Sequence, residues 1–230
     1  MRKVFVSAVL AAVSSTVMVG CENAGAVVLT PGVTTPLTGT TLAAEPFLAG
    51  TVLQDVLSPF TLTYDSNTVT GDVQSRVVQE TGSGTLDFYW RITTDPTSTG
   101  DISYLRLGNF AAGTYDADYR IDGLGDVAPT SAYLFTNPTP GYINFFFSGG
   151  LGGGDSSNFI FLHTDATSYS SSAFLDLASA GTYFESNEIA TFSPGVPELP
   201  TWLMMFLGFA GLGFTGHRQL KSAQMQTRSA

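Results

Sequence analysis

The feature that most constrains the fold is a repeated two-residue alternation of apolar and polar side chains. Residues 84–93, GTLDFYWRIT, have an apolar face made of Leu86, Phe88, Trp90 and Ile92. The opposite face is made of Asp87, Tyr89, Arg91 and Thr93. Residues 114–122, TYDADYRID, repeat the pattern. A period of two is typical of a half-buried β-strand, so we expect Trp90 in a core and Tyr89 on an exposed face.

The rest of the body continues this all-β pattern. Residues 142–147 (YINFFF) and 158–164 (NFIFLHT) are apolar on both faces, which predicts central strands. Further strand candidates are residues 60–64, 69–78 and 172–177. Clusters of Gly, Pro, Asn, Ser and Thr separate the runs at residues 93–101, 136–141 and 148–158. Eight to ten short strands with such turns predict a single antiparallel β-sandwich, jelly-roll or immunoglobulin-like.

The charge of the body excludes some partners. Between residues 27 and 197 there are four arginines, no lysine and 17 acidic residues, which gives a formal net charge of −13. Such a surface repels nucleic-acid phosphates, so we expect no nucleic-acid partner. The only cysteine, Cys21, precedes the body, which therefore has no disulfide and no thiol nucleophile.

Residues 1–26 have the order of a secretory signal peptide. Arg2 and Lys3 precede an apolar run, and the small residues Ala24-Gly25-Ala26 follow it. We therefore expect export through the Sec machinery. The sequence MVGC, which ends at Cys21, also approaches a bacterial lipobox, so lipidation of Cys21 is an alternative that would tether the protein to a membrane. Cleavage after Ala26 would instead remove this cysteine.

A second apolar segment lies near the other end. Residues 199–215 are 17 residues without a charge, a length of roughly 25 Å as a helix, which is the short limit for a membrane span. Arg218 and Lys221 follow it as a basic cluster. Because positive charge stays on the cytoplasmic side, these residues stop transfer and place the body outside the cytoplasm.

The segment around this helix resembles a known family signal. Val196, Pro197, Glu198, Leu199 and Pro200 precede the apolar run, and a glycine-rich GFAGLGF sequence and the basic cluster complete it. This order is similar to the PEP-CTERM sorting signal of Gram-negative bacteria. The resemblance implies recognition by an exosortase, a membrane-embedded processing enzyme, and association with exopolysaccharide or biofilm matrix. Leu199 departs from the second proline usual in the family, although Pro200 follows directly.

These features predict four parts of the chain. They are a signal peptide at 1–26, a β-sandwich body at 27–193, a sorting signal with a transmembrane helix at 194–218 and a basic cytoplasmic tail at 219–230. We expect the protein to be anchored transiently in the inner membrane with its body in the periplasm. After processing, it would lie at the cell surface or outside the cell.

No motif in the body predicts a catalytic, metal or cofactor site. The glycine-rich segment 148–158 lacks the lysine of a phosphate-binding loop and is expected to be a hairpin loop. Four acidic residues close in sequence suggest a calcium site: Asp116, Asp118, Asp122 and Asp126. On the strand interpretation, however, Asp116, Asp118 and Asp122 face water. His163, the only histidine of the body, has too few neighbouring ligands in sequence for a metal centre. Glu80, Glu185 and Glu188 are available as a carboxylate pair if the fold brings two of them together.

Two functions are therefore expected. The first is a non-catalytic surface or matrix protein, processed at its C-terminal signal. The second is a carbohydrate-binding or glycan-acting β-sandwich delivered to the same place. Exposed aromatic rings on one surface, or two carboxyl groups facing each other, would favour the second function.

Overall fold

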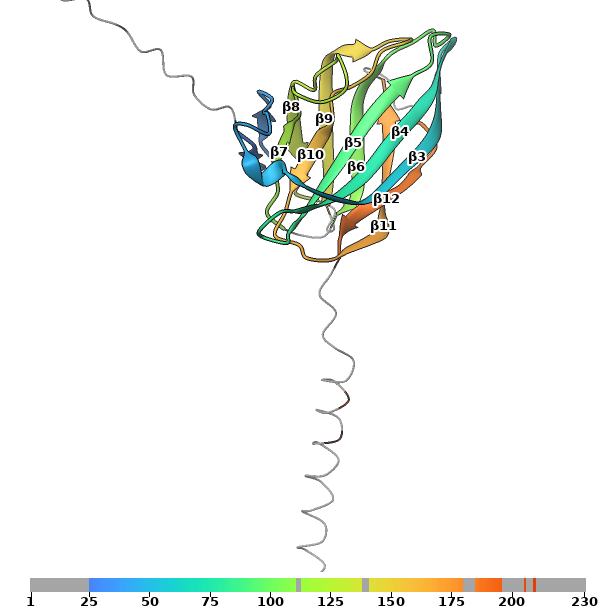
Figure 1. The fold of residues 1–230 in the computed structure, drawn as a ribbon. Coiled ribbons are helices and arrows are strands. Elements are labelled where there is room, and N and C mark those ends of the chain that lie inside the picture. The colour runs from blue at the N-terminus through green and yellow to red at the C-terminus, as the bar shows by residue number, and fades with distance from the viewer. Residues whose placement is uncertain are drawn as a thin grey trace, which may run out of the picture.

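The computed structural model describes residues 25–110, 113–137, 141–179 and 185–195, together with Met205 and Phe209. In these ranges the chain is almost entirely β, with 12 strands and one short 3-10 helix, η1 (Pro46–Leu48). Figure 1 shows the strands gathered in a single two-layered body.

The strands form two six-stranded sheets, here called sheet A and sheet B. In spatial order sheet A contains β1 (Val27–Val28), β7 (Asp116–Tyr119), β10 (Ile160–His163), β5 (Leu86–Thr94), β4 (Asn67–Glu80) and β3 (Gly50–Tyr64). Sheet B contains β12 (Ile189–Pro194), β11 (Tyr169–Ala178), β6 (Ile102–Phe110), β9 (Gly141–Leu151), β8 (Ser131–Leu134) and β2 (Thr34–Pro36). All pairings between these strands are antiparallel, as predicted for the all-β class.

Most of the predicted strands are present. The two segments that are apolar on both faces became β9 and β10, and each lies between two other strands of its sheet. The glycine-rich segment after Phe147 was predicted as a loop, and this was wrong for its first residues, because β9 continues to Leu151. β3 and β4 are longer than expected and pair through most of their length as one hairpin. Its two-residue turn begins at Asp65, whose φ of 51° is one that Asp tolerates.

The main core lies between the sheets. It contains the inward faces of both sheets, including Phe88 and Trp90 of β5 and Leu107 and Phe145 of sheet B, all at most 1% exposed. The prediction that Trp90 packs in the core is therefore confirmed. Its indole Nε1–H donates to Thr191 Oγ1 at 2.8 Å, so the one polar atom of the ring is satisfied across the core.

The outer face of sheet A is also partly buried. A second cluster contains Leu48, Val78, Tyr89, Phe159 and Phe161. The segment that includes η1 lies against this face, and Figure 1 shows it running past the strands of sheet A. Tyr89 is consequently only 5% exposed, so the expectation of an exposed Tyr89 was wrong. Alternation within a strand identifies two faces but does not show whether a distant segment covers the second one.

Candidate functional site

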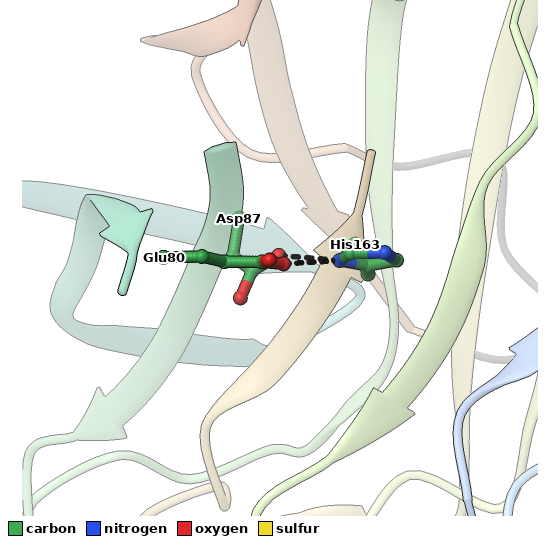
Figure 2. Close-up of side chains that lie close together, drawn as sticks. All are labelled: Glu80, Asp87 and His163. Carbon is green, nitrogen blue, oxygen red and sulfur yellow. Dashed lines mark hydrogen bonds and ion pairs between the residues drawn. The ribbon is translucent and has the colours of Figure 1, made fainter. Parts of the chain in front are cut away.

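Three polar side chains converge on the outer face of sheet A, at the ends of β4, β5 and β10. In the register of the sheet, Asp87 lies directly opposite His163 on one side and Val78 on the other. Glu80 is two residues after Val78 and therefore shares its face. Figure 2 shows both carboxylates pointing at the imidazole of His163. We call these three residues, Glu80, Asp87 and His163, the triad.

One nitrogen of the imidazole contacts both carboxylates. His163 Nδ1 lies 2.6 Å from Glu80 Oε1 and 2.9 Å from Asp87 Oδ1. The Asp87 side chain is fully buried and that of Glu80 is 4% exposed, whereas that of His163 is 24% exposed. The triad is therefore a buried acidic pair that solvent reaches only past the edge of one imidazole ring.

The pKa values of Asp87 and His163 are both raised, the first mainly by burial and the second mainly by a hydrogen bond. Burial raises the pKa of Asp87 to about 6, against the opposing hydrogen bond from His163. The hydrogen bond to Asp87 raises the pKa of His163 to about 9, despite the cost of burying the cation. The imidazole is therefore a cation at neutral pH, and its Nδ1 forms a hydrogen bond with Asp87 Oδ1 and an ion pair with Glu80 Oε1.

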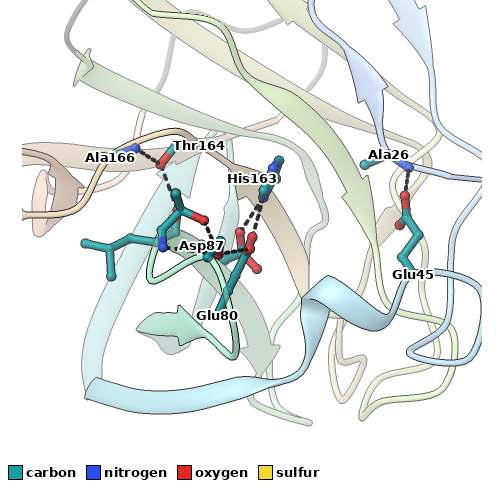
Figure 3. Close-up of polar contacts among 10 residues, drawn as sticks. Ala26, Glu45, Glu80, Asp87, His163, Thr164 and Ala166 are labelled. Atoms are coloured by element: carbon teal, nitrogen blue, oxygen red, sulfur yellow. Dashed lines mark hydrogen bonds and ion pairs between the residues drawn. The ribbon is translucent and has the colours of Figure 1, made fainter.

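Neighbouring residues hold the triad in place. Ser83 Oγ donates to Glu80 Oε2 at 2.5 Å, and the ring of Phe47 lies against that of His163 with centroids 4.7 Å apart. Thr164 Oγ1 donates to the Leu86 carbonyl at 2.7 Å, which fixes the chain directly after His163 (Figure 3). Figure 3 also shows the Ala26 N–H donating to Glu45 Oε1, at 2.7 Å.

A pocket of about 310 Å³ adjoins the triad on the same face. Val78 and Tyr89 line it, and each lies two residues from a triad member along its strand. The pocket is further lined by Arg76, Arg120 and Phe159. Arg76 is paired with Asp55 at 2.8 Å and Arg120 with Asp122 at 2.6 Å, so both guanidinium charges are already balanced. The lining of the pocket is therefore partly polar and partly apolar, and it carries little net charge.

The outer face of sheet B is a different surface, covered by aromatic rings. The rings form three pairs with centroids 4.7–6.0 Å apart: Tyr104 on β6 with Phe146 on the neighbouring β9, Tyr133 with Phe135 two residues further along the chain, and Tyr142 on β9 with Phe174 on β11, across β6. Phe135 is exposed and the other five rings are half-buried. We call these six rings the aromatic face.

A polar cluster lies among these rings. Arg106 Nη2 contacts Asp176 Oδ2 at 2.8 Å and Glu185 Oε2 at 2.7 Å, and the guanidinium carbon lies 5.4 Å from the centroid of the Tyr142 ring. The Arg106 side chain is 24% exposed and that of Glu185 is 41% exposed. Flat apolar surface and accessible hydrogen-bonding groups therefore lie side by side on sheet B.

The four clustered aspartates do not form a common site. Asp118 is fully buried and accepts backbone N–H bonds from Gly39 and Tyr119, so the expectation that it faces water was wrong. Asp122 accepts from Arg120 and from the Leu42 N–H, and Asp126 accepts from the Ser156 N–H. Within the described ranges, the one group of three acidic or histidine side chains close enough to share an ion is the triad.

The three glutamates considered as a carboxylate pair, Glu80, Glu185 and Glu188, do not pair with one another. Glu80 joins Asp87 rather than Glu185 or Glu188, and Glu185 instead contacts Arg106 on the other sheet. The sorting motif at residues 196–200, the basic pair Arg218 and Lys221, and Cys21 lie outside the described residues. Among the residues that are described, no helix is both long enough and apolar enough to cross a membrane.

Comparison with known proteins gave no match to a protein-family model, a curated protein or a solved structure. The geometry of the chain itself is therefore the basis for its interpretation.

Proposed function

We propose that this chain is an exported, non-catalytic protein of the cell surface or extracellular matrix, sorted by its C-terminal signal. The order of Pro197 and Glu198, an uncharged run of 17 residues, and then Arg218 and Lys221 carries this proposal. In this proposal the Sec machinery exports the chain, the apolar segment holds it in the inner membrane, and an exosortase processes it. The body of jelly-roll or immunoglobulin-like type is then released to the surface, where exopolysaccharide is the expected partner.

Processing is tested by expressing the full chain in Gram-negative hosts that differ only in an exosortase. Mass spectrometry of the C-terminal peptide should show loss of the basic tail in the competent host alone. A variant with Pro197→Ala and Glu198→Ala should keep its tail in both hosts. An intact C-terminus on the wild-type chain in the competent host would contradict the proposal.

The same preparation distinguishes the two N-terminal routes. Signal peptidase cleavage leaves a free N-terminus at residue 27, whereas lipoprotein processing leaves Cys21 as the first residue with attached lipid. Cys21→Ser should leave the mature N-terminus unchanged on the first route and block maturation on the second.

A second candidate function is polysaccharide binding by the body, and the aromatic face supports it. The apolar C–H faces of sugar rings pack on aromatic side chains, while their hydroxyl groups need hydrogen-bonding partners. Six rings lie on the same sheet as Arg106 and Glu185, which supply such partners, and one of the rings, Tyr142, contacts Arg106. The two carboxylates of the triad do not resemble the catalytic pair of a glycoside hydrolase, because they are buried and both contact one imidazole.

Binding is tested by co-sedimentation of the full chain with insoluble polysaccharides and with exopolysaccharide from the exosortase-containing host. Tyr142→Ala and Tyr104→Ala on the aromatic face should each weaken binding at least about tenfold, the effect of losing about 1.4 kcal/mol. Tyr119→Ala, a half-buried tyrosine on sheet A, is the matched control and should bind normally. Equal loss in all three variants, or no binding by the wild type, would contradict this function.

A further inference from the structure

We propose that Glu80, Asp87 and His163 form a binding site for one divalent transition-metal ion, with Zn²⁺ the ion that suits these donors best. This inference concerns sheet A and is independent of the sorting signal and of the aromatic face. It rests on the geometry of the three donors, on the charge that they bury and on the residues that hold them.

The donors already converge on one point. One ligand atom from each residue lies within 4.8 Å of the other two, and the three residues come from three adjacent strands. The Asp87–His163 part is fixed by the register of β5 and β10, where the two residues are directly opposite. The donor atoms therefore sit on a rigid sheet, which is the kind of support that holds a metal site in shape.

The buried charge of the triad is unbalanced without a further cation. Two carboxylates with side chains at most 4% exposed face one imidazole, whose Nδ1 has a single hydrogen to offer. Asp87 Oδ2 is buried and has no hydrogen-bond partner in the described structure. Leaving such a group unpaired is costly, and a buried carboxylate is usually paired or bound to a metal. A divalent ion between the three donors would contact both carboxylates and use the neutral imidazole as its third ligand.

The donor types select the metal. One imidazole nitrogen and two carboxylate oxygens suit zinc, whereas Ca²⁺ and Mg²⁺ take oxygen ligands almost exclusively. Three protein ligands leave the fourth position of a tetrahedral zinc for water. Zinc–ligand distances of about 2.1 Å place tetrahedral donors about 3.4 Å apart. The present separations of 2.6 and 2.9 Å are those of hydrogen bonds, so the donors must move apart by less than about 1 Å to admit the ion.

A second shell of contacts orients the ligands. Ser83 Oγ donates to Glu80 Oε2, the carboxylate oxygen that does not face His163, and so leaves Oε1 free to bind a metal. The Phe47 ring packs against the imidazole, with ring centroids 4.7 Å apart, and so restrains it. Asp116 lies directly opposite His163 on β7 and adds a further negative charge near the site. The partial exposure of His163 provides the entry path for the ion.

Metal binding is tested on the full chain in detergent after removal of metals with EDTA. Isothermal titration with ZnCl₂ should show one ion per chain with a dissociation constant of about 10 μM or tighter. Excess Zn²⁺ should raise the melting temperature by about 5 °C, because an ion that binds only the folded state stabilises it. Co²⁺ in place of Zn²⁺ should give the visible absorption bands of a tetrahedral site.

Conservative variants identify the ligands. His163→Gln, Asp87→Asn and Glu80→Gln should each weaken zinc binding at least tenfold and remove the cobalt bands. The matched control is His217→Gln, which changes the only other histidine of the chain and should leave binding intact. Asp65→Asn, in the exposed turn between β3 and β4, controls for loss of a carboxylate elsewhere.

Two results would overturn the site. One is a folded wild-type chain, judged by circular dichroism, that binds no zinc at a one-to-one ratio. The other is His163→Gln that binds zinc and gives the cobalt spectrum as the wild type does, since the ion would then lie elsewhere. If a triad variant fails to fold, the wild-type stoichiometry and the cobalt spectrum still decide. Neither result bears on exosortase processing or on polysaccharide binding.

Discussion

The ring of Phe174 occupies the space directly above Gly108 on the neighbouring strand. The two residues face each other in the register of β11 and β6, and a Cβ atom at position 108 would lie 2.2 Å from the ring. Gly108 therefore allows the ring to lie flat on the backbone and to meet Tyr142 on the next strand, with centroids 6.0 Å apart. This contact links β11 to β9 across the intervening strand β6.

Gly108→Ala should displace the Phe174 ring, because the new methyl group and the ring cannot share this space. We expect a loss of about 1–3 kcal/mol in the free energy of unfolding, the usual cost of overpacking, and weaker polysaccharide binding in the sedimentation assay. Urea denaturation measures the first effect. Gly149→Ala is the control, since no atom lies within 4 Å of the Cβ position there, and it should change stability by less than about 0.5 kcal/mol. Equal effects of the two substitutions would show that the contact with Phe174 is unimportant.

The strands were predictable from the sequence because each signal is local. Alternation placed Phe88 and Trp90 on the core face, and both are at most 1% exposed. Apolar character on both faces identified β9 and β10 as strands flanked by two others. β10 buries its side chains on both faces, whereas the outward rings of β9, Tyr142 and Phe146, are only half-buried on the aromatic face. The extra length of β3 was not predictable, since several of its residues are exposed apolar ones, such as Leu57 at 64%.

The triad was not predictable, because it depends on pairing between distant strands. Asp87 and His163 are 76 residues apart and meet only because β5 pairs with β10 in one register. Glu80 arrives through the β4–β5 hairpin, whose turn also carries Ser83. The sequence did show that Asp87 lies on the face opposite Trp90. It did not show that the segment around η1 would bury that face and so remove these charges from water.

Thr191→Val should destabilise the protein by about 1–3 kcal/mol, since it leaves the buried indole N–H of Trp90 without its acceptor. Valine matches threonine in shape, so packing changes little and the loss reports the hydrogen bond. Thr191 Oγ1 also donates to Ser75 Oγ at 3.1 Å, which adds to the loss. Thr63→Val, on an exposed position of β3, is the control and should be near neutral. A Thr191→Val protein as stable as the wild type in urea would contradict the role of this bond.

Asp118 should make the protein less stable as the pH rises from about 4 to 7. Burial raises the pKa of Asp118 to about 6 in the folded state, and the charge of Glu45 adds to the effect. The unfolded carboxyl titrates near 3.8, so between these values the folded state binds more protons and stability falls with increasing pH. The full difference is about 3 kcal/mol, reached above pH 6.

Asp118→Asn removes this titration while its side-chain oxygen still accepts from the Gly39 and Tyr119 N–H groups. The wild type should therefore lose up to about 3 kcal/mol relative to the variant between pH 4 and pH 7, measured by urea denaturation at several pH values. Asp65→Asn, in an exposed turn, should follow the wild-type profile. Parallel profiles for the wild type and Asp118→Asn would show that Asp118 is not the group responsible.

Gly125 and Gly82 separate two effects that usually occur together. Both have a φ of 110°, a backbone conformation that residues other than glycine rarely adopt. A Cβ at Gly125 would lie 2.0 Å from the backbone oxygen of Ser157, whereas no atom lies within 4 Å of the position at Gly82. Gly125→Ala and Gly82→Ala therefore share the backbone strain, and only the first adds a collision with backbone that cannot move aside. We expect Gly125→Ala to cost at least about 2 kcal/mol more than Gly82→Ala in urea denaturation.

Gly123 and Leu124, which line the pocket on sheet A, precede Gly125 directly, so Gly125→Ala should also alter the pocket wall. Equal losses in the two variants would mean that the chain around Gly125 moves away from Ser157 at no cost, and that the pocket wall is not held by this contact.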